Sequence, residues 1–555
     1  MENTCKDCAY TTCARLHTYA ARKCKLSDGK PCQECVEMAL LDSQISQVHS
    51  QLVQLAHKRH ALKTKINQRH EPFIHRLPWP ISSQIFEDYV HQVHSAFDPK
   101  ESSNSIYLRD WSPALFLSSI CTMWRKIAFA TSEIWRFINI PLLEDDLDIA
   151  LKIKLLDECV DRSCHRTLFI GLFQFQLYKP PLFYHYKQKL WDSKPLFRAI
   201  REEIAYYTEE ITLWGLPLLA LEFIIPSYTP NLRMVRITEC DGDFPDEDDD
   251  GPGLWYDGEI SLASPLLKSL HFGHRTHSLL ESCQIIWALG TITTVTMMSA
   301  DVKEGIDILR QAPCLTSCSF TFWEGYDSNK NLVNPPTIVN STLEKLHIDF
   351  SPCGRYSVKQ FANSVTLPSL RELSLRFRKL IYHDMVPLFK RSQCQVRTFS
   401  LTLDQNIPED DVLELLSILP SVEHFALEIL NEIQEPIITN KFFERLCDPH
   451  FTKPSGASTN PLLPELTSLS YTGKMYFTWP AFLEIFPPPG NVLAAGRPLS
   501  EVSLKLSSPV SDDLLDYERL YEIQQSKIKL VVTSLDGEAV NFSNSRRTYS
   551  KRLES

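Results

Sequence analysis

This sequence lacks the features that mark most enzymes, membrane proteins and nucleic-acid-binding proteins. Its 555 residues include only 17 glycines, and it contains no Gly-x-x-x-x-Gly-Lys, Gly-x-Gly-x-x-Gly, His-Glu-x-x-His or Gly-x-Ser-x-Gly motif. No apolar run approaches the roughly 18 residues of a membrane span, and the start is not that of a secretory signal. The formal net charge of −11 argues against a nucleic-acid-binding surface as the main function. We therefore expect a protein of the cytoplasm or nucleus that is not an enzyme, uses no cofactor, and binds neither membrane nor nucleic acid.

The composition nevertheless supports a large folded body. Hydrophobic residues make up 43% and aromatic residues 10% of the chain, which is enough for a substantial core. In an intracellular protein the 16 cysteines are expected to be mostly reduced thiols, and the Asn340-Ser341-Thr342 sequon then has no meaning for glycosylation.

The N-terminal tail, residues 1–35, holds six of these cysteines. Cys5 and Cys8 form one Cys-x-x-Cys pair, and Cys32 and Cys35 form a second. Four thiolates could hold a tetrahedral zinc ion, and so short a segment would need the metal in order to fold. The 23 residues between the pairs exceed the usual spacing, so a disordered tail with unpaired thiols is the preferred interpretation and zinc is the alternative.

A strict heptad follows in residues 36–70. Apolar residues alternate at steps of three and four, interrupted only by Arg59 at a core position, and they are Met38, Leu41, Ile45, Val48, Leu52, Leu55, Leu62 and Ile66. More than four heptads predict a coiled-coil helix, which could form a homodimer or fold back on the neighbouring segment. The basic residues of its second half indicate a solvated face, with an acidic partner as the alternative.

Residues 71–136 contain two one-faced amphipathic segments. The first segment has Ile81, Ile85 and Phe86 spaced for one helix face. The second has the same kind of spacing at Leu117, Ile120, Cys121, Trp124 and Ile127. Pro78, Pro80 and Pro113 suit helix starts. A polar stretch from His91 to Asp110 separates the segments; we expect it to be loop-like, with His91 and His94 solvated rather than metal-bound. Periodicity alone also allows both helices to pack entirely on the following domain.

The motifs Leu77-Pro78, Cys121-x-x-Trp124-Arg125 and Ile134-Trp135 resemble an F-box, in the form found in a large family of fungal F-box proteins. The resemblance implies a three-helix module that docks the Skp adaptor of an SCF (Skp-cullin-F-box) ubiquitin ligase. The residues that it assigns to the adaptor contact or its supporting core are Leu77, Pro78, Ile81, Ile85, Leu115, Leu117, Ile120 and Trp124. Pro80 stands where the family usually has an acidic residue.

A periodic region then occupies residues 137–540. Its unit is Leu-x-x-Leu-x-Leu, and the units that begin at Leu267, Ile292, Leu315, Leu343, Leu370, Val396 and Val422 are 23 to 28 residues apart. This spacing resembles that of leucine-rich repeats built from a strand and a helix. Helix-like stretches lie between units at Ser278–Leu289, Val302–Arg310, His383–Arg391 and Glu409–Leu419. Residues 137–230 contain a helix-like segment at Ala150–Val160 and strand-like segments at Thr167–Leu172 and Glu210–Trp214, without a clean repeat.

The predicted fold class is therefore α/β, with a short all-α F-box and a leucine-rich-repeat solenoid. The solenoid should have parallel strands on its concave face and helices on its convex face. A long heptad helix precedes these two parts, and a basic, disordered tail at residues 541–555 follows them. Side chains between the leucines should point out of the concave face and bind a target protein; a merely solvated face is the alternative. The candidate target-binding residues are Lys345, His347, Glu372, Ser374, Arg376, Thr398, Ser400, Thr402 and His424. The predicted function is substrate recognition for an SCF ligase, and the alternative is an interaction scaffold outside any ligase.

Overall fold

The structure is a computed structural model. It describes residues 33–69, 77–95, 112–142, 149–173, 193–214, 216, 224–226, 228–238, 259–262, 264–273, 284–287, 289–323, 337–378, 382–404, 407–430, 437–447, 462–486, 498–507, 519–520, 522–523 and 528–534.

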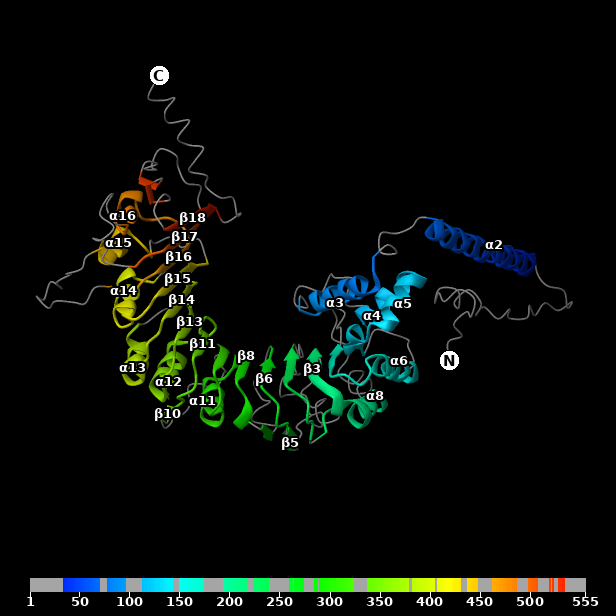
Figure 1. The fold of residues 1–555 in the computed structure, drawn as a ribbon, viewed down its shortest axis with the longest axis horizontal. Coiled ribbons are helices and arrows are strands. Elements are labelled where there is room, and N and C mark those ends of the chain that lie inside the picture. Colours follow the sequence, from blue (N-terminus) through cyan, green and yellow to red (C-terminus); the bar gives the residue numbers. More distant parts are fainter. Residues whose placement is uncertain are drawn as a thin grey trace, which may run out of the picture.

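One parallel sheet of 14 strands runs through the molecule and curves into an arc (Figure 1). The strands lie across the sheet in the order in which they occur along the chain, so the sheet grows by one repeat at a time. Its strands are β1 Phe137–Pro141, β2 Leu168–Phe173, β3 Thr208–Trp214, β4 Met234–Thr238, β6 Ser269–Phe272, β8 Thr294–Ala300, β9 Ser317–Phe322, β11 Lys345–Asp349, β13 Glu372–Phe377, β14 Thr398–Leu403, β15 His424–Ile429, β16 Ser468–Gly473, β17 Glu501–Leu506 and β18 Lys529–Ser534.

Helices cover the convex side of this sheet in its second half (Figure 1). The helices that follow the first strand are α6 Ile149–Arg162, α8 Lys194–Ala199, α11 Val302–Gln311, α12 Arg355–Ser364, α13 Tyr382–Ser392, α14 Glu409–Ser417, α15 Asn440–Cys447 and α16 Trp479–Leu483. The expected helices at Val302–Arg310, His383–Arg391 and Glu409–Leu419 are confirmed as α11, α13 and α14. The predicted leucine-rich-repeat solenoid is therefore the fold of this region.

The core follows from the alternation of side chains along each strand. In β9, β13 and β14 every second residue is buried and the residues between are partly exposed. The buried positions include a series of phenylalanines that stack between repeats: the ring centroids of Phe322 and Phe350 are 5.5 Å apart, and those of Phe350 and Phe377 are 5.4 Å apart. Each repeat thus buries its apolar face against its neighbours.

One expectation for this region was wrong. The stretch Ser278–Leu289 is not one helix, because Gln284–Trp287 forms strand β7 and pairs in parallel with β5, Glu259–Leu262, in a small separate sheet. The β-branched and aromatic residues of Ile285-Ile286-Trp287 favour this extended form. The strand-like segments expected at Thr167–Leu172 and Glu210–Trp214 are confirmed as β2 and β3, which together with β1 form the first three strands of the main sheet.

A buried asparagine joins two successive repeats. Asn340 donates hydrogen bonds from its amide nitrogen to the carbonyl oxygens of Leu309 and Ala312, at 3.0 and 3.1 Å, and its amide oxygen accepts from the backbone N–H groups of Thr342 and Leu343. The first two partners are carbonyls at the end of α11, for which the helix itself provides no N–H donor. The Asn340 side chain therefore connects the end of α11 to the next repeat inside the fold.

Replacing this asparagine should destabilise the solenoid. We expect Asn340→Leu to lower the free energy of unfolding by at least about 2 kcal/mol, because it leaves buried backbone groups without hydrogen-bond partners. Urea unfolding followed by circular dichroism measures the change, and Ser341→Ala at the exposed neighbouring position is the control. Equal midpoints for the two variants would contradict the connecting role of Asn340.

Candidate functional site

Three short helices and a 3-10 turn form a module at the N-terminal end of the sheet (Figure 1). They are α3 Trp79–Ser95, α4 Pro113–Ile120, α5 Thr122–Ala130 and η4 Ser132–Arg136. The Ser112 side chain caps α4 by accepting from the N–H of Ala114, and Pro113 occupies the first helical turn. Cys121 separates α4 from α5 in an extended conformation, and its Sγ accepts from the N–H of Trp124. The sequence thus determines where each helix starts.

The inner faces of these helices form one apolar core that is continuous with that of the solenoid. Phe86 of α3 is buried and its ring lies 5.0 Å from that of Trp124. Trp135 is buried too, and its indole N–H donates to the carbonyl oxygen of Ala128 at 2.7 Å. The module is therefore part of the same folded body as the repeats.

The module also leaves apolar side chains on its surface. Six large residues are between 40% and 48% exposed: Trp79, Ile81, Ile85, Phe116, Ile120 and Phe129. Pro78, Ile81 and Ile85 are separated by three and four residues, so they follow one face of α3, and Phe116 and Ile120 do the same on α4. We call Pro78, Ile81, Ile85, Phe116 and Ile120 the exposed apolar strip.

The eight predicted adaptor residues differ in exposure. Pro78, Ile81, Ile85 and Ile120 are exposed, whereas Leu77, Leu115 and Trp124 are half-buried. Leu117 is buried in the core. Sequence reasoning did not include Phe116, which lies one helical turn before Ile120 and could have been found by that spacing.

The loop expected at the two histidines was wrong, whereas His91 is exposed as expected and His94 is half-buried. Helix α3 continues to Ser95, so His91 and His94 lie on a helix and not in a loop. The ring of His94 is 4.7 Å from that of Phe137 and 5.3 Å from that of Phe169, and its Nε2 is 3.9 Å from a carboxylate oxygen of Glu210. This end of α3 therefore packs on the first strands of the sheet.

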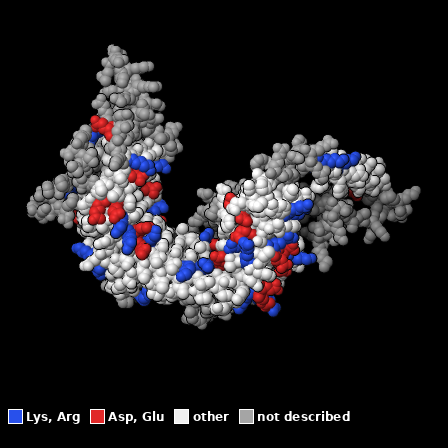
Figure 2. Space-filling view, in the orientation of Figure 1, with Lys and Arg blue, Asp and Glu red and all other residues white. Residues whose placement is uncertain are grey.

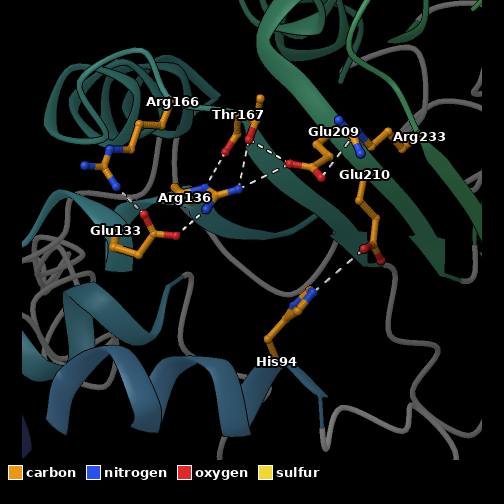
Figure 3. A network of polar contacts seen from close by, with 8 residues as sticks. All are labelled: His94, Glu133, Arg136, Arg166, Thr167, Glu209, Glu210 and Arg233. Atoms are coloured by element: carbon orange, nitrogen blue, oxygen red, sulfur yellow. Dashed lines mark hydrogen bonds and ion pairs between the residues drawn. The ribbon is translucent and has the colours of Figure 1, made fainter. Parts of the chain in front are cut away.

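A polar network joins the module to three successive repeats (Figure 3). Arg136, the last residue of η4, donates to the carbonyl and hydroxyl oxygens of Thr167 at 2.7 and 2.8 Å, and to Glu209 at 3.2 Å. Arg233 lies 3.7 Å from the other oxygen of Glu209. In a separate contact, the guanidinium of Arg162 in α6 lies over the ring of Phe129 of the module, 3.5 Å from its centroid. These contacts fix the orientation of the module on the solenoid.

Glu133 is the second anion of this network. It pairs with both Arg136 and Arg166. Burial opposes its ionisation, but the hydrogen bonds and charges of the two arginines outweigh burial and lower the pKa of Glu133 below its ordinary value of 4.5. At neutral pH the carboxylate is charged and holds the two guanidinium groups together.

Neutralising Glu133 should weaken the junction in a pH-dependent way. Since its pKa is lower in the folded protein, its contribution is present above about pH 4.5 and is lost as the pH falls through the folded pKa. We expect Glu133→Gln to lower the free energy of unfolding by about 1–2 kcal/mol at pH 7, with the difference from the parent protein shrinking below pH 4.5. Chemical unfolding at several pH values measures this.

A carboxylate in an exposed pair provides the control. Glu202 pairs with Arg198 at 2.8 Å, and both side chains are more than half exposed. Glu202→Gln should leave the free energy of unfolding almost unchanged. A difference for Glu133→Gln that stays constant from pH 7 to pH 3 would disprove the charged role of Glu133.

The concave face is the second candidate surface. All nine predicted target-binding residues lie at the outward positions of β11, β13, β14 and β15, and the strand register places them in three rows. The first row contains Lys345, Glu372, Thr398 and His424, the second contains His347, Ser374 and Ser400, and the third contains Arg376 and Thr402. These rows continue beyond the predicted residues, because the same register adds Ser470, Ser503 and Lys505 from β16 and β17 and Thr212, Arg236 and His271 from β3, β4 and β6.

Charges on this face are paired across neighbouring strands. Lys345 lies 2.8 Å from Glu372, and Arg376 lies 3.2 Å from Asp404 and 3.8 Å from Asp349. On the visible side of the molecule, acidic and basic side chains alternate without a large area of one sign (Figure 2). A target would therefore meet hydroxyl groups and mutually compensated charges, which favours recognition by shape and hydrogen bonds.

Among the residues that the structure describes, no three histidine, cysteine, aspartate or glutamate side chains are grouped to hold a metal ion. Cys5, Cys8 and Cys32 lie outside the described residues, as does the side chain of Cys35. No helix in the described part of the chain has the length and apolar character to cross a membrane.

The sheet and its helices define the class: the chain contains a leucine-rich-repeat solenoid. No family model matches the sequence, and no curated protein matches it. Among solved structures, the chain is similar to the leucine-rich repeat-containing protein LegL7 from Legionella pneumophila, with 12% identity over 51% of this chain and 89% of that one, at a TM-score of 0.27. At this TM-score the likeness does not define the fold, which is assigned from the order and direction of the 14 strands.

Proposed function

We propose that this protein is the substrate-recognition subunit of an SCF ubiquitin ligase. Its N-terminal module would dock the Skp adaptor as an F-box does, and the concave face of the solenoid would bind a target protein. Binding of a protein by the solenoid follows from the fold, because a leucine-rich-repeat solenoid presents an extended surface suited to protein binding. Docking to the Skp adaptor is supported by the resemblance of the module to an F-box and by its exposed apolar strip.

The exposed apolar strip is the main observation in favour of docking to the adaptor. The module already has its own core of Phe86, Leu117, Ile127 and Trp135, so Ile81 and Ile85 are not needed to fill it. Large apolar side chains that are contiguous on a helix surface and not used for folding mark interaction sites. Burying each against a partner contributes roughly 1.5–3 kcal/mol, so several together could offset the roughly 4–15 kcal/mol lost on association.

The protein would act by proximity and would transfer no group itself. A target on the concave face is held near the conjugating enzyme that the adaptor and cullin recruit, which raises the effective concentration of the target's lysines. The network around Arg136 supports this role, because a module fixed to the first repeats keeps the two binding surfaces at a constant separation. Such a subunit would work in the cytoplasm or nucleus, where these ligases act.

The test is binding to a recombinant Skp-type adaptor by the intact chain. We expect Ile81→Asp with Ile85→Asp to raise the dissociation constant at least about 100-fold, because two apolar contacts are lost and two charges are placed in the interface. Both positions are exposed, so thermal unfolding should be unchanged. Isothermal titration calorimetry provides the measurement.

Val339→Asp is the matched control, since Val339 is exposed on the short strand β10, Ile338–Val339. It should bind the adaptor as the parent protein does. If the parent chain does not bind the adaptor at all, the protein is instead a leucine-rich-repeat interaction scaffold that works outside the ligase. The concave face and its paired charges would then be the part to investigate further.

A further inference from the structure

Helix α2, Gln33–Arg69, carries a second apolar surface that the proposed function does not use. Its 37 residues correspond to about 55 Å of helix, and it projects away from the module and the sheet (Figure 1). All eight heptad residues are between 46% and 63% exposed: Met38, Leu41, Ile45, Val48, Leu52, Leu55, Leu62 and Ile66. So long an apolar seam on a helix is the geometry of one strand of a coiled coil.

The heptad positions define which residues would flank the seam. With Met38, Ile45, Leu52, Arg59 and Ile66 at position a, the d positions are Leu41, Val48, Leu55 and Leu62. The flanking g positions then include Glu37, Lys58 and Lys65, and the e positions include Asp42 and Lys63. The acidic flanking residues are thus all near the start of the helix and the basic ones all near its end.

This distribution of charge disfavours a parallel pair of helices. In a parallel dimer each g residue meets the e residue five positions later in the other copy. Glu37 would then face Asp42 of the second copy, and Lys58 would face Lys63. Arg59 would also face Arg59 of the second copy across the seam. Each of these contacts brings like charges together.

The same distribution favours an antiparallel pair. Here g faces g and e faces e, and an alignment that places Leu52 of one copy beside Val48 of the other sets a residues beside d residues along the seam. Glu37 then faces Lys65 of the second copy, and Asp42 faces Lys63. Arg59 lies beside Leu41 of the second copy, so its charged group can extend to solvent.

We propose that the chain forms a homodimer through an antiparallel coiled coil of α2. The partner is a second copy of this chain, because the acidic and basic ends of one helix complement those of an identical helix in the opposite direction. The apolar seam supplies the attraction and the flanking charges select the direction. This proposal does not depend on docking to an adaptor.

Charge reversal at one end tests the direction. In the full-length protein we expect Lys63→Glu with Lys65→Glu to weaken the dimer roughly 100-fold, because four opposite-charge contacts become like-charge contacts in the symmetric dimer. The same double variant would strengthen a parallel dimer, because Lys58 would then face the carboxylate introduced by Lys63→Glu. Sedimentation equilibrium measures the dissociation constant, with a monomer of 63.8 kDa as the reference.

A fourfold variant provides the rescue. Adding Glu37→Lys and Asp42→Lys to the double variant restores opposite charges at both ends of an antiparallel pair, so dimerisation should return to within a few-fold of the parent protein. Ile45→Asp with Leu55→Asp should abolish it. Thermal unfolding of the solenoid should be the same in all variants, because these side chains lie on the exposed helix.

Three results would overturn the proposal. The first is a parent protein that remains monomeric at micromolar concentrations, which would assign the seam to a different partner or to the chain itself. The second is a tighter dimer for the Lys63, Lys65 double variant, which would indicate parallel helices. The third is a fourfold variant that stays as weak as the double variant.

Discussion

The whole structure depends on the inability of one repeat to bury its own apolar face. A strand such as β13 has buried residues at every second position, and they are covered only by β11 and β14 on either side and by helices behind them. A sheet built in this way exposes an apolar edge at its first strand unless something covers it. At the N-terminal end the cover is the three-helix module, whose Phe86, Trp135 and Ile134 lie in the same core as Phe137 and Ile138 of β1.

This arrangement gives the module two roles on two of its faces. Its inner face closes the solenoid and is fixed there by Trp135, by the packing of His94 against Phe137 and Phe169, and by the Arg136 network. Its outer face keeps Ile81, Ile85 and Ile120 exposed. Capping the repeats does not use these apolar residues, and this is why we propose a partner for the outer face.

The sequence allowed prediction of the elements whose pattern is strictly periodic. The leucine spacing from Leu267 to Val422 predicted the strands correctly, since an inward apolar residue at every second position leaves little choice of register. The heptad predicted the helix at Gln33–Arg69 for the same reason. The outward residues of four strands could be named because they lie between the leucines, although those of β16 and β17 were not read in this way.

What could not be predicted depended on contacts distant in the sequence. β1, β2 and β3 are separated by irregular intervals, so their membership of the sheet is visible only through pairs such as Ile138 with Ile170 and Ile170 with Ile211. His94 looked solvated because its partners, Phe137, Phe169 and Glu210, are 43 to 116 residues further along the chain.

The junction between the module and the sheet has a mechanical consequence. Phe137 of β1 directly follows Arg136 of the module, with no hinge residue between them. The junction is therefore rigid at this point. The outer face of the module is held at a fixed angle to the concave face of the solenoid.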